Sequence, residues 1–210
     1  MTKKLLKVVF FCALAVGMAS IAGATPSCTG FNVTVGGSCI SANDLTYTFT
    51  NLTYTPNETA SLTVAEDTVS GSDDTLLFQI SAALPVDVLL DYTVTGRGIE
   101  GIDASYGSST SATGSITETA CGVAFGTGGT CSDVLSTIFD TTPGVVVKGT
   151  PAEFAPVSTV YITKDVEDQM PNVFSEFSDS IVTPEPMTLS LMGMGLLGIG
   201  LFGRRSRRSK

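Results

Sequence analysis

The strongest constraint on the fold is a strict alternation of apolar and polar residues in the first third of the chain. Apolar and polar side chains alternate through Leu45–Thr50 and, after one extra residue, again through Asn51–Thr55. A period of two, built from threonine and aromatic residues, is typical of a β-strand with one buried face. The pattern therefore predicts strands that pack one face on a core.

Similar short segments recur along the middle of the chain and are separated by clusters of Gly, Ser, Thr and Asp. Strands at this spacing with polar turns between them predict an all-β fold, an antiparallel β-sandwich or a jelly-roll-like domain. Residues 95–98 are predicted as one of the turns, and Val134–Phe139 as a short turn of helix. The further strand candidates are Ser61–Val64, Thr75–Ser81, Val86–Thr95, Ser115–Phe125, Gly144–Lys148 and Val157–Thr163.

The N-terminal end has a different composition. Lys3, Lys4 and Lys7 form a basic start, residues 5–22 are apolar, and a small-residue pattern ends in Ala22-Gly23-Ala24. This order is typical of a secretory signal peptide. We expect residues 1–24 to be a signal peptide cut after Ala24, with an uncleaved N-terminal membrane anchor as the alternative.

The C-terminal end combines three different segments. The motif Pro184-Glu185-Pro186 is followed by an apolar run over residues 187–203 and then by a basic tail. The run is close to the lower limit of roughly 17 residues for a transmembrane helix, and a basic tail is expected to stay cytoplasmic. The basic residues of the tail are Arg204, Arg205, Arg207, Arg208 and Lys210.

These three segments, in this order, closely resemble the PEP-CTERM sorting signal of Gram-negative bacteria. The resemblance implies that an exosortase-type membrane transpeptidase recognises residues 184–186 while the transmembrane segment and the basic tail hold the precursor in the inner membrane. It also implies delivery to the cell surface or extracellular matrix, and an association with exopolysaccharide and biofilm. The alternative is an ordinary C-terminal membrane anchor.

Between the two ends we predict a β-sandwich ectodomain over residues 25–164 and an acidic linker over residues 165–183. This middle section carries three basic residues, Arg97, Lys148 and Lys164, against nineteen acids, a net charge of −16 compared with −9 for the whole chain. So acidic a domain should repel nucleic acid and anionic lipid. The charge suits divalent cations or basic and neutral polymers, or simply keeps the domain soluble.

Four cysteines remain after removal of the signal peptide, and an exported domain meets an oxidising compartment. Three pairings are possible. We favour Cys28 with Cys39 and Cys121 with Cys131, because each pair closes a short loop rich in Gly, Ser and Thr. Such bonds add roughly 2–3 kcal/mol each in the loop-entropy description.

The residues offer little chemistry for catalysis. The chain has no histidine, so Ser–His–Asp and Cys–His arrangements and the usual His-containing zinc sites are excluded, and no phosphate-binding glycine motif occurs. We therefore assign no catalytic residue and predict that the protein is not an enzyme. Weak candidates for Ca²⁺ ligands are Asp73 and Asp74 in one predicted loop and Asp165 and Asp168 in another, although solvated acidic loops are the default interpretation.

The resulting prediction is a structural protein of the cell surface or matrix, without a cofactor. One alternative is a glycan-binding module that uses Tyr47, Tyr54, Tyr92 or Tyr161 on a sheet face, although the chain lacks tryptophan. The other is a hydrolase that acts through a pair of carboxylates. The sequence does not name the ligand or partner.

Overall fold

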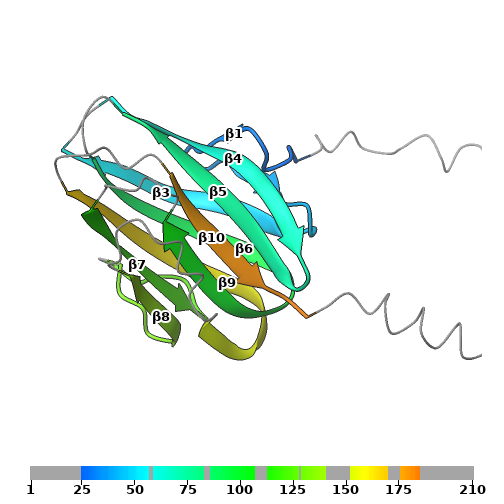
Figure 1. Cartoon of the computed structure of the whole chain (residues 1–210). Helices are drawn as coiled ribbons and strands as arrows, with labels where there is room; N and C mark the ends of the chain where they lie inside the picture. Colours follow the sequence, from blue (N-terminus) through cyan, green and yellow to red (C-terminus); the bar gives the residue numbers. More distant parts are fainter. Residues whose placement is uncertain are drawn as a thin grey trace, which may run out of the picture.

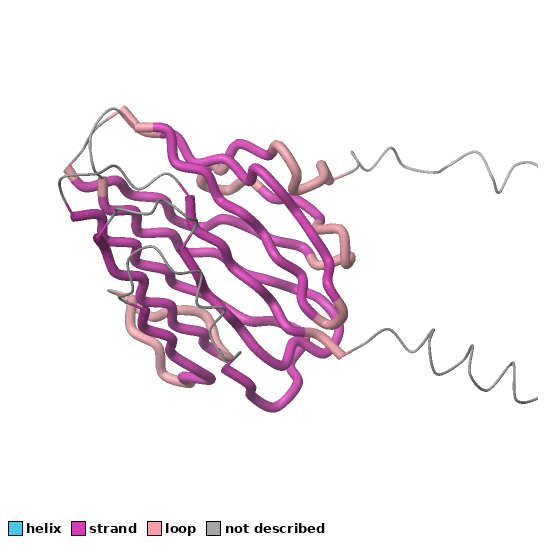
Figure 2. The backbone as a smooth tube through the Cα atoms, viewed as in Figure 1, coloured by secondary structure: helices cyan, strands magenta, loops and turns pink. Residues whose placement is uncertain are grey.

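The computed structural model describes residues 25–56, 59–82, 86–106, 113–127, 129–140, 152–169 and 176–184. Within these residues there are ten strands and no helix, which confirms the all-β prediction, and Figure 2 shows how completely strands dominate the described chain. The strands are β1 (Phe31–Asn32), β2 (Ser38–Ile40), β3 (Thr46–Thr55), β4 (Ser61–Ser70), β5 (Asp73–Ser81), β6 (Asp87–Tyr106), β7 (Thr113–Cys121), β8 (Val134–Asp140), β9 (Ala152–Gln169) and β10 (Glu176–Val182).

All ten strands hydrogen-bond into one sheet, and the pairs between the named strands are antiparallel. The order is β1-β4-β5-β10-β6-β9-β7-β8, and β3 joins β6 on a second path with β2 beyond it. The long strand β6 is the junction, because its first half pairs with β3 and its second half with β10. β9 runs along the other side of β6.

The sheet closes over itself in a sandwich-like arrangement, so that β3 and the first half of β6 face β5 and β10. Phe49 on β3 meets Phe78 on β5 edge to face, with ring centroids 6.3 Å apart, and Phe78 stacks on Phe177 of β10 at 5.0 Å. β3 pairs with neither β5 nor β10, so the contact between Phe49 and Phe78 crosses the core rather than running along the sheet. Figure 1 shows β4, β5 and β10 passing over β3.

The alternation that predicted β3 is present with its expected interruption. Leu45, Tyr47 and Phe49 are buried, and the register with β6 shifts between Phe49 and Asn51. A one-residue shift of this kind is a β-bulge, which changes the side-chain phase without ending the strand. The extra residue in the sequence pattern therefore corresponds to an irregularity in the pairing of β3 with β6.

The prediction of a turn at residues 95–98 was wrong, because β6 continues through them. The register with β9 is interrupted between Thr95 and Ile99. Gly98 has a φ of 66°, a conformation that favours glycine, and a Cβ on Gly96 would collide with the side chain of Leu45. Glycine inside a strand often marks a bulge or a close approach rather than a chain reversal.

The prediction of an acidic linker over residues 165–183 is also contradicted. Residues 165–169 continue β9, and β10 occupies a central position with β5 on one side and β6 on the other. Phe177, Asp179 and Ile181 alternate toward the core and are fully buried. The acidic composition of the segment concealed this period of two, which is the signal of a strand.

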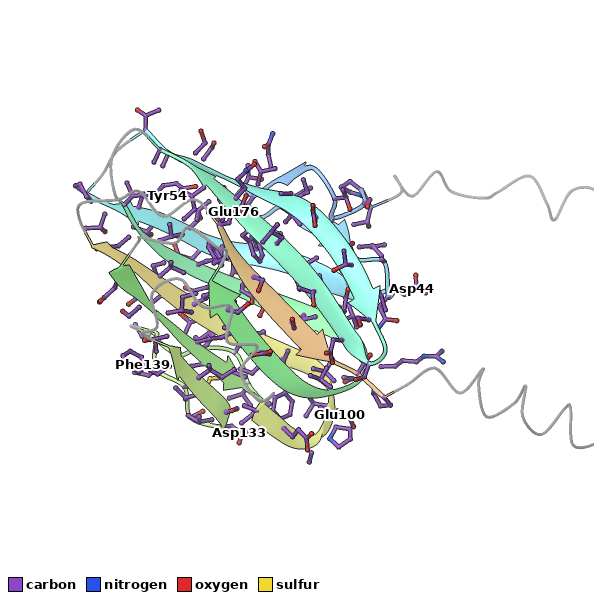
Figure 3. All side chains as sticks on the ribbon, in the orientation of Figure 1. Asp44, Tyr54, Glu100, Asp133, Phe139 and Glu176 are labelled. Atoms are coloured by element: carbon purple, nitrogen blue, oxygen red, sulfur yellow. A yellow bond between two sulfur atoms is a disulfide. The ribbon has the colours of Figure 1, made fainter. Side chains whose placement is uncertain are left out.

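The short helix predicted over Val134–Phe139 is instead the edge strand β8. It pairs with β7 from Ile116 to Cys121. Pairing with a neighbour outweighs weak local helix propensity. Phe139 is 66% exposed and points away from the sheet at this edge (Figure 3).

Both favoured disulfides are present. Cys28 bonds to Cys39, and Cys121 bonds to Cys131. The first joins the beginning of the described chain to β2, and the second closes the connection between β7 and β8. Disulfides are characteristic of proteins that fold in an oxidising, extracellular type of environment.

Candidate functional site

The predicted sorting motif begins directly at the end of the folded domain. Thr183 is buried and its backbone N–H donates to the carbonyl of Ser72 at 2.9 Å. Pro184 is exposed, and its ring lies 3.0 Å from the position that a Cβ on Gly98 would take. Glu185, Pro186, the apolar run 187–203 and the basic tail 204–210 lie outside the described residues, as do Ala22 and Ala24 of the predicted signal cleavage site.

An open depression of about 540 Å³ surrounds this exit point. Arg97 is exposed beside it and is the described basic residue nearest the motif. We assign the depression no ligand. Its lining residues are Asn43, Asp44, Leu45, Gly96, Arg97, Thr183 and Pro184.

The weak calcium candidates do not lie in loops. Asp73 and Asp74 open β5, and Asp165 lies within β9, where it is exposed. Asp168 is also in β9, and its side chain is outside the described set. Across the described part of the chain no three His, Cys, Asp or Glu side chains converge as metal ligands would.

The tyrosines proposed for a sugar-binding face do not form one. Tyr47 and Tyr92 are buried in the core, where their rings stack with centroids 6.2 Å apart. Tyr54, labelled in Figure 3, and Tyr161 are half-buried. Tyr54 packs against the hydrophobic core, so it offers little free ring surface for stacking.

The most unusual chemistry in the described domain is a lysine buried between two carboxyl groups, a set that we call the lysine cluster. It consists of Lys164 on β9, Glu118 on β7 and Asp179 on β10, all with 0% exposed side chains. Glu118 and Leu90 are the cross-strand partners of Lys164 on either side. Asp179 comes from β10, which does not pair with β9, so the lysine spans the core to reach it.

The distances within the lysine cluster are short. Nζ of Lys164 lies 2.6 Å from Oε2 of Glu118 and donates to Oδ1 of Asp179 at 3.2 Å and to the carbonyl of Ser178 at 3.3 Å. The contact with Glu118 is close but not aligned as a hydrogen bond, and neither oxygen of Glu118 accepts one from the described residues. A buried carboxyl group without such bonds is costly to keep ionised.

The surroundings of the lysine cluster are aromatic. The hydroxyl of Tyr92 donates to Oδ2 of Asp179 at 2.5 Å. The ring of Phe177 lies 5.6 Å from Nζ, within the range of a cation–π interaction. Asp179 therefore has one oxygen held by a tyrosine and the other directed at the lysine.

Burial and charge act in opposite directions on these groups. Burial raises the pKa of Glu118 well above its usual value; the Asp179 carboxylate adds to this rise, and Lys164 opposes it. For Lys164, burial lowers the pKa, but Asp179 and Glu118 together outweigh it and leave the pKa raised. Burial thus favours the neutral form of Glu118, while the two acids favour the charged form of Lys164.

A second pair of acids, the aspartate cluster, consists of the buried Asp74 and the half-buried Asp67 and contains no lysine. Asp74 accepts a hydrogen bond from the hydroxyl of Ser41, and the hydroxyl of Tyr47 lies 3.5 Å from the same oxygen. Asp67 accepts the backbone N–H of Ala42 at 2.9 Å. Burial raises the pKa of Asp74 to about 7, with Asp67 contributing to the rise and Ser41 opposing it.

Neither cluster was identified from the sequence, although a signal exists. Lys164 occupies the same alternating phase as the buried residues Ile162 and Val166, and Glu118 lies between the buried residues Ile116 and Ala120. A charged residue in the buried phase of a strand must find a partner inside the core. The positions of Lys164 and Glu118 in the buried phase of their strands distinguish them from the acids and bases at solvent-facing positions.

In comparisons with protein-family models, curated protein sequences and solved structures, nothing matched this chain. Among the described residues there is no helix of the length and apolar character that a membrane crossing requires.

Proposed function

We propose that this chain is an exported structural protein that is carried to the cell surface or extracellular matrix by a PEP-CTERM-type tag. The observation that carries the proposal is the order of Pro184-Glu185-Pro186, an apolar run and a basic tail after a domain with two disulfides. In this proposal an exosortase-type transpeptidase processes the chain near the motif, and residues 1–24 direct export. Exopolysaccharide is the proposed partner in the matrix.

The end of the folded domain adds a geometric condition to this proposal. Because Thr183 is buried and Pro184 rests on Gly98, the motif follows the sheet without a spacer. The processing enzyme would therefore have to act next to the folded domain or before β10 has joined the sheet. The depression around Pro184 gives the folded form some room for such an approach.

No second function is proposed. Glu118 and Asp179 are a close pair of acids, but both are fully buried, so a glycan substrate does not reach them in this conformation. Tyr47 and Tyr92 are likewise turned into the core.

The test is the intact mass of the mature protein from its native host, measured separately in the membrane and extracellular fractions. We expect a chain that begins at Thr25 and ends near Pro184, with or without an added lipid or glycan. Replacing Glu185 with Ala should leave unprocessed precursor in the membrane, whereas the control Glu167→Ala, at an exposed position on β9, should be processed normally. Normal release of Glu185→Ala, or a mature chain that retains Lys210, would refute the tag.

A further inference from the structure

The lysine cluster brings an amine and a carboxyl group together in the arrangement that an amide bond requires. Nζ of Lys164 lies 3.2 Å from Oδ1 of Asp179 and 2.6 Å from Oε2 of Glu118. The amine thus has an electrophile on one side and an acid–base group on the other. All three side chains come from strands of the sheet interior and are fully buried, which limits their motion away from this geometry.

We propose that Nζ of Lys164 and Cγ of Asp179 condense into an intramolecular amide bond, with Glu118 as the acid–base group. The crosslink would join β9 to β10 through the core. It is a single reaction within one chain, so it does not make the protein an enzyme. It also does not depend on the proposed sorting route, because its three participants lie within the described domain.

The protons and atoms of this reaction balance without a further reactant. The ammonium of Lys164 first gives a proton to the carboxylate of Asp179, so that a neutral amine faces a neutral carboxyl group. The amine attacks Cγ, and the N–C bond forms as a tetrahedral intermediate. Glu118 takes a proton from the nitrogen and returns one to the departing oxygen, which leaves as water.

The contacts of Asp179 indicate which oxygen remains. Oδ2 accepts the hydrogen bond from Tyr92, and such a donor polarises the carbonyl and stabilises charge that develops on its oxygen. Oδ1 is the oxygen that contacts the amine. We therefore assign Oδ2 as the oxygen of the final amide and Oδ1 as the oxygen lost in water.

The environment favours the product over the separated groups. Burying two ions is costly even when they are paired, and the amide buries no charge at all. Fixed placement gives the two reactants a very high effective concentration, which intramolecular reactions exploit. The raised pKa of Glu118 favours the proton-bearing form that donates to the departing oxygen once the nitrogen has released its proton.

The position of the bond gives it a mechanical consequence. Asp179 lies on β10, the last strand before the proposed sorting motif. Lys164 lies on β9, which pairs with β6 on one side and β7 on the other. A force applied to the C-terminal end would be transmitted from β10 through the amide to β9. It would therefore not separate β10 from β5 and β6. This consequence, unlike the bond itself, rests on the proposed attachment through the C-terminal tag.

Trypsin offers a sharp test, because it cuts after lysine only when the side chain is a free amine. Between its two ends the chain has only Arg97, Lys148 and Lys164 as cutting sites. The full-length chain is produced in an exporting bacterial host, reduced, alkylated, digested and analysed by tandem mass spectrometry. We expect one peptide that starts at Gly149, remains uncut at Lys164, and is lighter than its sequence by one water.

Several results would overturn the proposal. Two peptides that meet at Lys164, together with the full sequence mass, would show that no bond forms. Loss of water with normal cutting after Lys164 would indicate a cyclic imide at Asp179 rather than the crosslink. Fragment ions from breaks between residues 164 and 179 would also contradict it, because the amide closes that segment into a loop.

A matched pair of variants tests the role of Glu118. In Glu118→Gln the acid–base group is lost with little change of shape, and we expect the cut at Lys164 and the full mass to return. Glu167→Gln, on the exposed face of β9, should remain crosslinked. If Glu118→Gln is still crosslinked, Glu118 takes no part in the reaction. If that variant does not accumulate, the wild-type digest still decides whether the bond exists.

Discussion

The lysine cluster and the aspartate cluster both contain buried carboxyl groups, Glu118 and Asp179 in the first and Asp74 in the second, but only the first contains a cation. Glu118 and Asp179 have Lys164 between them. Asp74 and Asp67 have hydroxyl and backbone donors, from Ser41, Tyr47 and Ala42. In the first cluster a buried lysine compensates the charge of the carboxyl groups. In the second cluster the carboxyl groups have only neutral hydrogen-bond donors.

The comparison shows how the partner decides the chemistry. Hydroxyl donors do not neutralise a carboxylate, so burial prevails and the pKa of Asp74 rises to about 7. In the lysine cluster burial also raises the pKa of Glu118, against the opposing effect of Lys164, and the lysine in addition supplies a nucleophile. The aspartate cluster is therefore suited to storing a proton, and the lysine cluster to forming a bond.

The largest effect is expected when Lys164 is replaced by Met, which gives the lysine cluster the character of the aspartate cluster. Near pH 7 the free energy of unfolding should fall by at least about 3 kcal/mol, because the variant loses the bond between Lys164 and Asp179 and leaves two buried acids without a cation. The loss should shrink as the pH falls and Glu118, whose pKa is raised by burial, becomes protonated. Urea unfolding at several pH values measures this change.

The control for this prediction is the double variant Lys164→Met with Glu118→Gln. It removes one of the two facing acids, and it should recover part of the lost stability near pH 7. A Lys164→Met protein as stable as the wild type at every pH would mean that the lysine does not compensate these acids.

The next largest effect should come from Asp74→Asn, which removes the titration of the aspartate cluster. A raised pKa means that the folded state binds the proton more tightly, so this contribution to stability is complete below about pH 4 and is lost as the pH rises to 7. A rise from 3.8 to about 7 corresponds to about 4 kcal/mol over that window. The Asn variant should match the wild type near pH 4 and exceed it by up to that amount near pH 8.

The charged groups around Asp74 are Asp67 and Asp179, and both raise its pKa. Asp73→Asn, at the neighbouring and partly exposed position, is the matched control and should change this pH dependence little. Parallel stability curves for the wild type and Asp74→Asn between pH 4 and 8 would show that Asp74 is ionised in the folded state throughout.

Much of the fold could be predicted because strand alternation is a local property of the sequence. The alternation through Leu45–Thr55 predicted β3, and the short spacing of the cysteines predicted both disulfides. The bend within β6 and the identity of β8 depend on pairing partners far away in the sequence. Glycines at positions 96 and 98 look the same in a turn and in a bulge until the neighbouring strands are known.

The lysine cluster could not be predicted because its members are far apart in the sequence. Glu118, Lys164 and Asp179 come from three strands, and Asp179 lies in the segment that its acidic composition made resemble a linker. The strand phase of Glu118 and of Lys164 indicates that each is buried, but it does not say which residues they meet. Only the order of the strands, with β10 across the core from β9, brings the three together.

The smallest effects should come from removing one tyrosine hydroxyl from each cluster, Tyr92→Phe and Tyr47→Phe. Tyr92 donates at 2.5 Å to Asp179, whereas Tyr47 lies 3.5 Å from Asp74, at the limit of a hydrogen bond. Both residues are buried and their rings stack on each other, so the lost packing is matched. We expect the free energy of unfolding to fall by about 1–1.5 kcal/mol for Tyr92→Phe, which loses a short buried hydrogen bond, and by less than about 1 kcal/mol for Tyr47→Phe. Urea unfolding measures both variants, and equal losses would show that the two clusters hold their acids alike, contrary to the distinction drawn from the lysine.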